Sequence, residues 1–188
     1  KPDQQSRAYS KDEAERIANG QAAHNALATR IAYDAGLRAH ELLTLRRSDE
    51  AGPTRARQWR SDLFQGRTGV RYVVTGKGGL SREVMLSHGL SLALEGRRLG
   101  APRWVRDRKI NYQSHYAIGG GHGWSNSFTK RSKTEFGHSR GAHGLRHGFA
   151  QSRFATLKAR ASSEKDAKQI LSQELGHFRE EIVEVYLR

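Results

Sequence analysis

The hydrophobic pattern of this 188-residue sequence changes its period along the chain, and this change constrains the fold more than any other feature. Residues 21–34 place apolar side chains at helical spacing, with Leu27 and Ile31 on one face. Residues 69–87, GVRYVVTGKGGLSREVMLS, alternate around a glycine-rich turn instead, which predicts two antiparallel strands. Helical spacing returns in the second half. The sequence therefore predicts a mainly α fold with one small antiparallel β-sheet, an α+β domain.

Local end signals divide the helical parts further. Ser10 followed by Glu13 is a capping-box pattern, and it predicts a helix that ends at Gly20. Gly36 is expected to end the helix of residues 21–34. Further helices are predicted within residues 39–47, 87–100, 124–136, 144–157, 161–177 and 178–188, and an irregular loop over residues 100–123.

The charge of the chain points to a polyanionic partner. Lysine and arginine total 33 against 19 acidic residues, a formal net charge of +14. Such an excess causes self-repulsion unless a polyanion balances it, and nucleic acid is the expected one. No basic face is joined to a strong apolar stripe, and no apolar run reaches the length of a membrane span, so a membrane partner is not expected. Cysteine is absent, which excludes thiolate chemistry and suits a reducing bacterial cytoplasm.

The stretch GAHGLRHGFA gathers two histidines and an arginine within five residues. His143 and His147 have the i, i+4 spacing of a helical zinc site, but no Glu stands between them and Arg146 would repel a cation. A metal site is therefore disfavoured. His143 and Arg146 could instead converge on one small anion, with arginine supplying a planar fork for phosphate oxygens. The alternative is a solvated basic helix start.

Four other residues could carry chemistry, and each has a simpler explanation. Arg38 lies between two apolar segments, either as a surface residue or as a functional cation oriented by Glu41. Lys77 stands at the tip of the predicted hairpin, where lysine usually serves solubility. His177 follows a predicted helix end. Tyr186 fits an apolar contact, but a phenol can also form a covalent phosphoryl intermediate.

The order of these residues resembles the catalytic domain of the tyrosine recombinases, the phage-integrase family. GLRAHELLTL is similar to the first arginine motif of that family, and TGKGGLSREVMLS to its lysine-bearing hairpin. HGLRHGFA is similar to its His-x-x-Arg-His segment, and LSQELGH precedes Tyr186 at the spacing of the family. The resemblance covers roughly residues 9–188. The segment between Arg146 and His177 is longer than the family pattern.

The resemblance implies a role for each motif residue. Tyr186 would attack a DNA phosphodiester and become a 3′-phosphotyrosine, so neither a metal nor ATP would be needed as a cofactor. Two arginines would hold the phosphate oxygens, two histidines would add hydrogen bonds, and Lys77 would protonate the leaving oxygen. His143 could also accept the tyrosine proton, whereas His147 is expected to be structural. The implied catalytic set is Arg38, Lys77, His143, Arg146, His177 and Tyr186.

The implied function is a site-specific recombinase or integrase of a mobile genetic element. Two alternatives stay open: a type IB topoisomerase-like enzyme that nicks and reseals one strand, and a DNA-binding regulator that has lost catalysis. The expected partners are double-stranded DNA, three further copies in a homotetramer, and accessory DNA-bending proteins. The DNA backbone would contact Arg46, Arg47, Lys130, Arg131 and Lys133.

The family pattern also implies a division of the chain. Residues 1–10 are expected to be a linker that follows an absent N-terminal DNA-binding domain. Residues 11–188 would form the catalytic domain, truncated at its C-terminal end just after the tyrosine.

Overall fold

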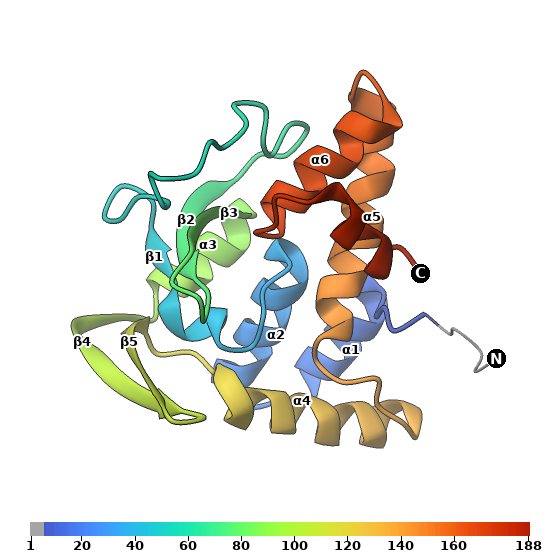
Figure 1. Cartoon of the computed structure of the whole chain (residues 1–188). Helices are drawn as coiled ribbons and strands as arrows, with labels where there is room; N and C mark the ends of the chain where they lie inside the picture. Colours follow the sequence, from blue (N-terminus) through green and yellow to red (C-terminus); the bar gives the residue numbers. More distant parts are fainter. Residues whose placement is uncertain (1–5) are drawn as a thin grey trace.

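The computed structural model describes residues 6–188 and has the predicted α+β composition (Figure 1). Helices form most of the body, a three-stranded sheet lies at one side, and a separate two-stranded hairpin extends from it. The helices are α1 (Lys11–Asn19), α2 (Ala23–Ala35), α3 (His88–Glu95), α4 (Gly121–Phe136), α5 (Gly144–Arg160) and α6 (Glu164–Glu174), with 3₁₀ segments η1 (Glu41–Thr44) and η2 (Glu180–Val185).

The first helix begins and both of the first two helices end where their sequence signals predict, whereas α2 begins at Ala23 instead of residue 21. The Glu13 backbone N–H donates to Ser10 Oγ at 3.1 Å, and the Ser10 N–H donates to the Glu13 carboxylate at 2.9 Å, so the capping box is confirmed. α2 ends at Gly36, whose φ of +70° is the left-handed conformation that favours glycine. This turn delivers the chain directly to Arg38.

The predicted hairpin of residues 69–87 is also confirmed. β2 (Val70–Thr75) and β3 (Ser81–Leu86) pair in antiparallel register, from Val70 opposite Leu86 to Thr75 opposite Ser81. The short β1 (Arg46–Arg47) extends this sheet along β2. Lys77 lies in the connecting turn, as predicted.

The predicted helix over residues 39–47 is wrong. The structure has only the 3₁₀ segment η1, followed by strand β1. The Arg38 backbone N–H donates to the Glu41 side chain at 2.8 Å, and the Thr75 N–H donates to Thr44 Oγ1 at 2.9 Å. These bonds, together with the pairing of β1 on β2, satisfy backbone groups that an α-helix would otherwise have used.

The predicted loop over residues 100–123 and the expectation of one sheet are wrong as well. β4 (Arg98–Asp107) and β5 (Ile110–Tyr116) form a second antiparallel sheet, and α4 begins at Gly121. Tyr112, Ser114 and Tyr116 are buried in alternation along β5. A register shift between Arg98 and Arg103, within LGAP, hides the strand period in β4. The last predicted helix is the 3₁₀ segment η2, directly before Tyr186.

The core consists of two apolar clusters. The larger joins α1, α2, the three-stranded sheet and α4, and the smaller joins α5, α6 and η2 and includes Tyr186. Tyr9 is fully buried in the larger cluster, and its hydroxyl lies 2.8 Å from Ser132 Oγ. Half of the predicted linker, residues 1–5, lies outside the described residues, and the domain limits stay a prediction. No helix in residues 6–188 is both long and apolar enough to cross a bilayer.

Gly36→Ala tests the turn that follows α2. A Cβ at this position would meet the ring of Phe149 and would force alanine into a positive φ. We expect the free energy of unfolding, measured by urea titration, to fall by about 2–4 kcal/mol. Gly137→Ala is the matched control, because Gly137 also has a positive φ but open space around its Cβ position, so only the backbone cost of about 1 kcal/mol applies. Equal losses in the two variants would contradict the packing argument.

Candidate active site

The buried guanidinium of Arg146 joins the ends of two helices. Arg146 lies in the first turn of α5 and is 0% exposed. Its Nη1 donates to the carbonyl of Gly36 at 2.6 Å, and its Nη2 donates to the carbonyl of Leu175. These carbonyls cap α2 and α6, where the helix leaves acceptors unsatisfied and carries partial negative charge. The two helix ends therefore hold the cation of Arg146 in one orientation.

The third donor of Arg146 points to the hydroxyl of Tyr186. Arg146 Nε lies 3.1 Å from Tyr186 Oη, and the guanidinium carbon lies 5.2 Å from the centre of the tyrosine ring. Tyr186 directly follows η2 and is 6% exposed. Residues 40 positions apart along the chain thus bring a phenol oxygen onto an arginine, a contact that the sequence left open.

His177 stands beside both arginines of the motif. Its Nε2 lies 3.2 Å from Arg38 Nη2 and 3.5 Å from Arg146 Nη2. The Gly-His pair ends α6 with the two hydrogen bonds of a Schellman motif, in which the His177 N–H reaches Ser172 and the Gly176 N–H reaches Gln173. Gly176 has a φ of +87°, so the glycine in LSQELGH is what turns the histidine toward the arginines.

Glu41 is the buried counter-charge of this cluster. Its carboxylate lies 2.9 Å from Arg82 Nη2 and 3.7 Å from Arg38 Nη1, and its side chain is 1% exposed. Although burial raises the pKa of Glu41, the charges of Arg82, Arg146 and Arg38 lower it to about 2. The prediction that Glu41 could orient Arg38 agrees with these distances.

The cluster holds more positive charge than Glu41 can balance. Desolvation, followed by the charges of Arg82 and Arg38, lowers the pKa of Arg146 to about 10. Desolvation and the charges of Arg146 and Arg38 lower the pKa of His177 to about 4. Desolvation and the charges of Arg146, His147 and Arg38 lower the pKa of His143 to about 4. Both rings are therefore neutral at pH 7 while the guanidiniums keep their charge. Such a site favours an anion.

A cleft of about 650 Å³ opens over this cluster. Arg38, His143 and Lys77 all line it, so the turn of the β2–β3 hairpin faces the arginines across open space. A chain of contacts leads from the cleft to the other three residues: Arg38 contacts His177, His177 contacts Arg146, and Arg146 contacts Tyr186. The structure thus brings the six predicted residues into one region.

Two arginines of the cleft were not predicted. Arg82 on β3 is 1% exposed and bonds both Glu41 and the Glu174 carbonyl, the latter at 2.6 Å. Arg108, from the turn between β4 and β5, also lines the cleft. An arginine within a predicted strand can be recognised as part of a buried ion pair only when its carboxylate partner is known. The partner of Arg82 is Glu41, which lies 41 positions away in the sequence. The turn that carries Arg108 was hidden by the wrong loop prediction.

His147 packs directly against the tyrosine. Its ring centre lies 4.8 Å from that of Tyr186 and 5.4 Å from that of His143. The residue is 4% exposed, and its Nδ1 has no hydrogen-bond partner within residues 6–188. Desolvation, with Arg7 and Arg146, lowers the pKa of His147 to about 4. A neutral ring in this place supports the phenol by packing, in line with the structural role predicted for it.

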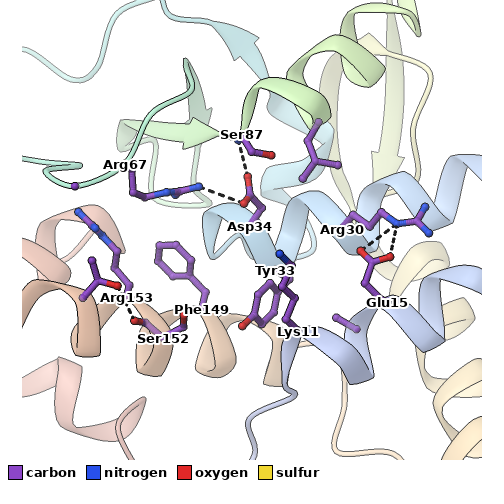
Figure 2. Close-up of a pocket in the computed structure, with 14 residues that line it drawn as sticks. Lys11, Glu15, Arg30, Tyr33, Asp34, Arg67, Ser87, Phe149, Ser152 and Arg153 are labelled. Atoms are coloured by element: carbon purple, nitrogen blue, oxygen red, sulfur yellow. Dashed lines mark hydrogen bonds and ion pairs between the residues drawn. The ribbon is translucent and has the colours of Figure 1, made fainter.

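A second pocket, of about 520 Å³, lies between α1, α2 and α5 (Figure 2). Its charges are largely paired with one another: Arg67 lies 3.2 Å from Asp34, and Arg30 lies 3.1 Å from Glu15. Of the residues that the structure describes, no member of the predicted catalytic set lines this pocket. The predicted catalytic residues therefore gather at the first cleft and not at this one.

The five residues predicted to contact DNA lie on β1 and α4, outside the lining of the cleft. Arg46 and Arg47 form β1, and Arg47 pairs with Asp49 at 3.0 Å. Lys130 and Lys133 are exposed on α4, whereas Arg131 pairs with Glu135 at 3.1 Å. Within residues 6–188 none of the five lines the cleft, and their contact with DNA stays a prediction. Across residues 6–188, no three His, Cys, Asp or Glu side chains form a cluster that could hold a metal ion.

Comparison with solved structures identifies the fold. The site-specific recombinase XerH, bound to palindromic difH substrate in a post-cleavage complex, matches 97% of this chain at a TM-score of 0.54 and 16% identity. The pre-cleavage complex of XerH with difH matches 96% at 0.52 and 17% identity. The fold is that of a tyrosine recombinase catalytic domain. This chain spans about half the length of the recombinase chains, 49% and 50%. No family model matches the sequence, and no curated protein does so significantly.

Glu41→Gln tests the buried counter-charge under this recombinase fold. Removing the carboxylate leaves Arg82 buried without its partner, so the free energy of unfolding at pH 7 should fall by about 3–5 kcal/mol. The pKa of Glu41 is lowered in the folded state, from 4.5 to about 2. Its stabilisation is therefore present above about pH 4.5 and is lost as the pH falls toward 2.

The measurement is urea unfolding of both proteins between pH 7 and pH 2. The difference between wild type and Glu41→Gln should shrink across the acid window. Glu164→Gln, at a side chain that is 66% exposed, is the control and should stay within about 0.5 kcal/mol of wild type. A constant difference at every pH would show that the charge of Glu41 is not what stabilises the cluster.

Proposed function

We propose that this protein is a site-specific DNA recombinase that cuts and rejoins DNA through a 3′-phosphotyrosyl intermediate. The observation that carries the proposal is the contact of 3.1 Å between the Tyr186 hydroxyl and Arg146 Nε, inside a cluster whose excess positive charge calls for an anion. A nucleophilic oxygen and a phosphate-binding fork that lie together suit phosphoryl transfer. The fold shared with XerH supports the same reaction.

In the first step, the Tyr186 oxygen attacks the scissile phosphorus and forms the phosphotyrosine bond, while the bond from phosphorus to the 5′-oxygen breaks. Arg38 and Arg146 bind the non-bridging oxygens, where negative charge increases in the transition state. Their guanidiniums are held in place before substrate arrives by Glu41 and by the ends of α2 and α6, so little reorganisation is needed.

Two protons must move in this step. His143 is neutral at pH 7 and its ring centre lies 5.8 Å from that of Tyr186, which supports it as the acceptor of the phenol proton. Lys77 lines the cleft from the glycine-rich turn GKGG of the β2–β3 hairpin and supplies the proton to the departing 5′-oxygen. The 5′-hydroxyl of a second strand then attacks the phosphotyrosine, and the phosphodiester is restored without ATP or metal.

The finer assignments belong to the same proposal. The reaction would integrate or excise a mobile genetic element in the bacterial cytoplasm. Four copies would assemble on two DNA sites, assisted by proteins that bend the DNA. Arg46, Arg47, Lys130, Arg131 and Lys133 would hold the flanking backbone. A preceding DNA-binding domain would complete the enzyme, as the half-length match to XerH suggests.

Covalent trapping tests the nucleophile. The protein is incubated with a pool of duplexes of random sequence, each nicked so that the short 5′-hydroxyl strand diffuses away after cleavage. We expect wild type to form a protein–DNA adduct on a denaturing gel and Tyr186→Phe to form none. Sequencing the trapped DNA gives the target site.

Tyr33→Phe is the matched control, because it removes a phenol that lines the second pocket rather than the cleft. Adducts in both wild type and Tyr186→Phe would exclude Tyr186 as the nucleophile. On an intact supercoiled plasmid that carries the trapped site, relaxation without joining of two sites would favour the topoisomerase alternative. Binding without any adduct would favour the regulator.

Lys77→Ala tests the general acid. Loss of proton donation should slow cleavage of an ordinary phosphodiester on the order of 10²–10⁴-fold. A substrate with sulfur in place of the bridging 5′-oxygen has a leaving group that needs no proton, so the variant should cleave it nearly as fast as wild type. The measurement is the rate of adduct formation on both substrates. An equal defect on both would assign Lys77 to phosphate binding instead.

A further inference from the structure

The hairpin of β4 and β5 carries a concentration of unpaired positive charge beside the cleft. Between Gly96 and Tyr116 the only acidic residue is Asp107, and its carboxylate accepts the His122 N–H at 2.9 Å. Arg98 is paired with Glu50 and Glu95. Arg97 is half-buried and donates to the Ala117 carbonyl at 2.7 Å. Four further cations are exposed and form no ion pair within residues 6–188; they are Arg103, Arg106, Arg108 and Lys109.

The turn of this hairpin has an unusual sequence for its shape. Asp107 pairs with Ile110, so the two-residue turn consists of Arg108 and Lys109, with φ of +47° and +69°. Positive φ at both positions is the type I′ pattern, for which asparagine and glycine are strongly preferred. Two bulky cations are held in a conformation that disfavours them. Strain of this kind persists where the surrounding structure enforces it, and it accumulates at functional sites.

Contacts with α4 and η1 hold the turn of Arg108 and Lys109 in this conformation. Asp107 binds the N-terminal end of α4, and Gly121 allows the carboxylate to approach closely, since a Cβ there would collide with it. Arg108 Nη2 lies 3.2 Å from His122 Nδ1. At the other strand, Ser114 Oγ donates to the Leu43 carbonyl in η1 at 2.7 Å. The hairpin is thus anchored to the 3₁₀ segment that carries Glu41.

One face of the hairpin is free to meet a ligand. Tyr112, Ser114 and Tyr116 turn inward, so their neighbours in the alternation form the outer face. There Trp104 lies opposite Gln113, and Arg106 lies opposite Asn111. Trp104 is 71% exposed, the most exposed of the large aromatic side chains. An aromatic ring, an arginine and two amides suit sugar and phosphate better than an apolar protein surface.

We propose that the β4–β5 hairpin is a DNA-binding arm, in which Arg108 and Lys109 bind backbone phosphates beside the scissile one and the face with Trp104 and Arg106 lies along the duplex. This inference rests on the proposed function, because Arg108 lines the same cleft as Arg38 and Lys77. A duplex that places one phosphate on Arg38 brings its neighbouring phosphates to the turn. In Figure 1 the hairpin projects from the body at lower left, with its turn beside the start of α4.

The test is the salt dependence of DNA binding, measured in the Tyr186→Phe background so that cleavage does not contribute. Each phosphate contact that is lost reduces the slope of log K against log salt by about 0.9. For Arg108→Gln/Lys109→Gln we expect the slope to fall by about 1.8, and the affinity at 0.1 M salt by on the order of 10- to 100-fold. Trp104 fluorescence should change on DNA binding, and Trp104→Phe should abolish that change.

The matched control is Lys158→Gln/Lys165→Gln, which removes the same charge from exposed positions at the junction of α5 and α6, at the far end of the molecule in Figure 1. Its slope should stay near that of the parent. Equal slopes in the hairpin variant and this control would overturn the arm. Thermal unfolding of both variants excludes a folding defect.

The outcomes separate the arm from the catalytic proposal. If the chain traps DNA through Tyr186 but the hairpin variant keeps the full slope, only the arm is wrong. If the hairpin variant loses slope while wild type forms no adduct, the arm stands and the recombinase chemistry fails. If no DNA binds at all, both are overturned.

Discussion

The rest of the site depends on the hydrogen bonds of the buried Arg146 guanidinium. Two of them reach carbonyls at the ends of α2 and α6, and the third, from Nε, reaches the Tyr186 hydroxyl. A cation without these acceptors could not stay buried, because desolvation of an unpaired charge is costly. The two helices therefore have to end at this point. Their ends then place Arg38 and His177 beside the same cation.

Electrostatic imbalance connects this architecture to chemistry. Three arginines surround the single carboxylate of Glu41, and the nearby histidines respond by staying neutral at pH 7. The other buried carboxylate nearby, Glu174, does not reduce this repulsion, because it pairs with Arg153 at 2.7 Å. A phosphate entering the cleft would relieve the repulsion as it binds. Under the proposed function, stability and substrate affinity would therefore oppose each other at this site, as is common for preorganised active sites.

Sequence patterns predicted the elements that local chemistry controls. The capping box at Ser10, the helix end at Gly36 and the hairpin around Lys77 follow from short-range preferences and were confirmed. The two errors have different causes. Residues 46–47 become a strand because they pair with β2, which lies far away in the chain. β4 and β5 are neighbours in the chain, and their hairpin was missed because the register shift in β4 conceals the alternation of a strand.

The sequence by itself determined which chemical groups are available and their order: two arginines, a lysine, two histidines and a tyrosine in motifs that resemble those of the tyrosine recombinases. It also determined the glycines that let the chain turn at residues 36 and 176. Only the tertiary structure decided that Arg82 joins Glu41, that Arg146 holds Tyr186, and that Arg108 reaches the cleft. The physical reason is that motifs specify local turns, whereas burial of charge demands partners that packing alone can bring from distant parts of the chain.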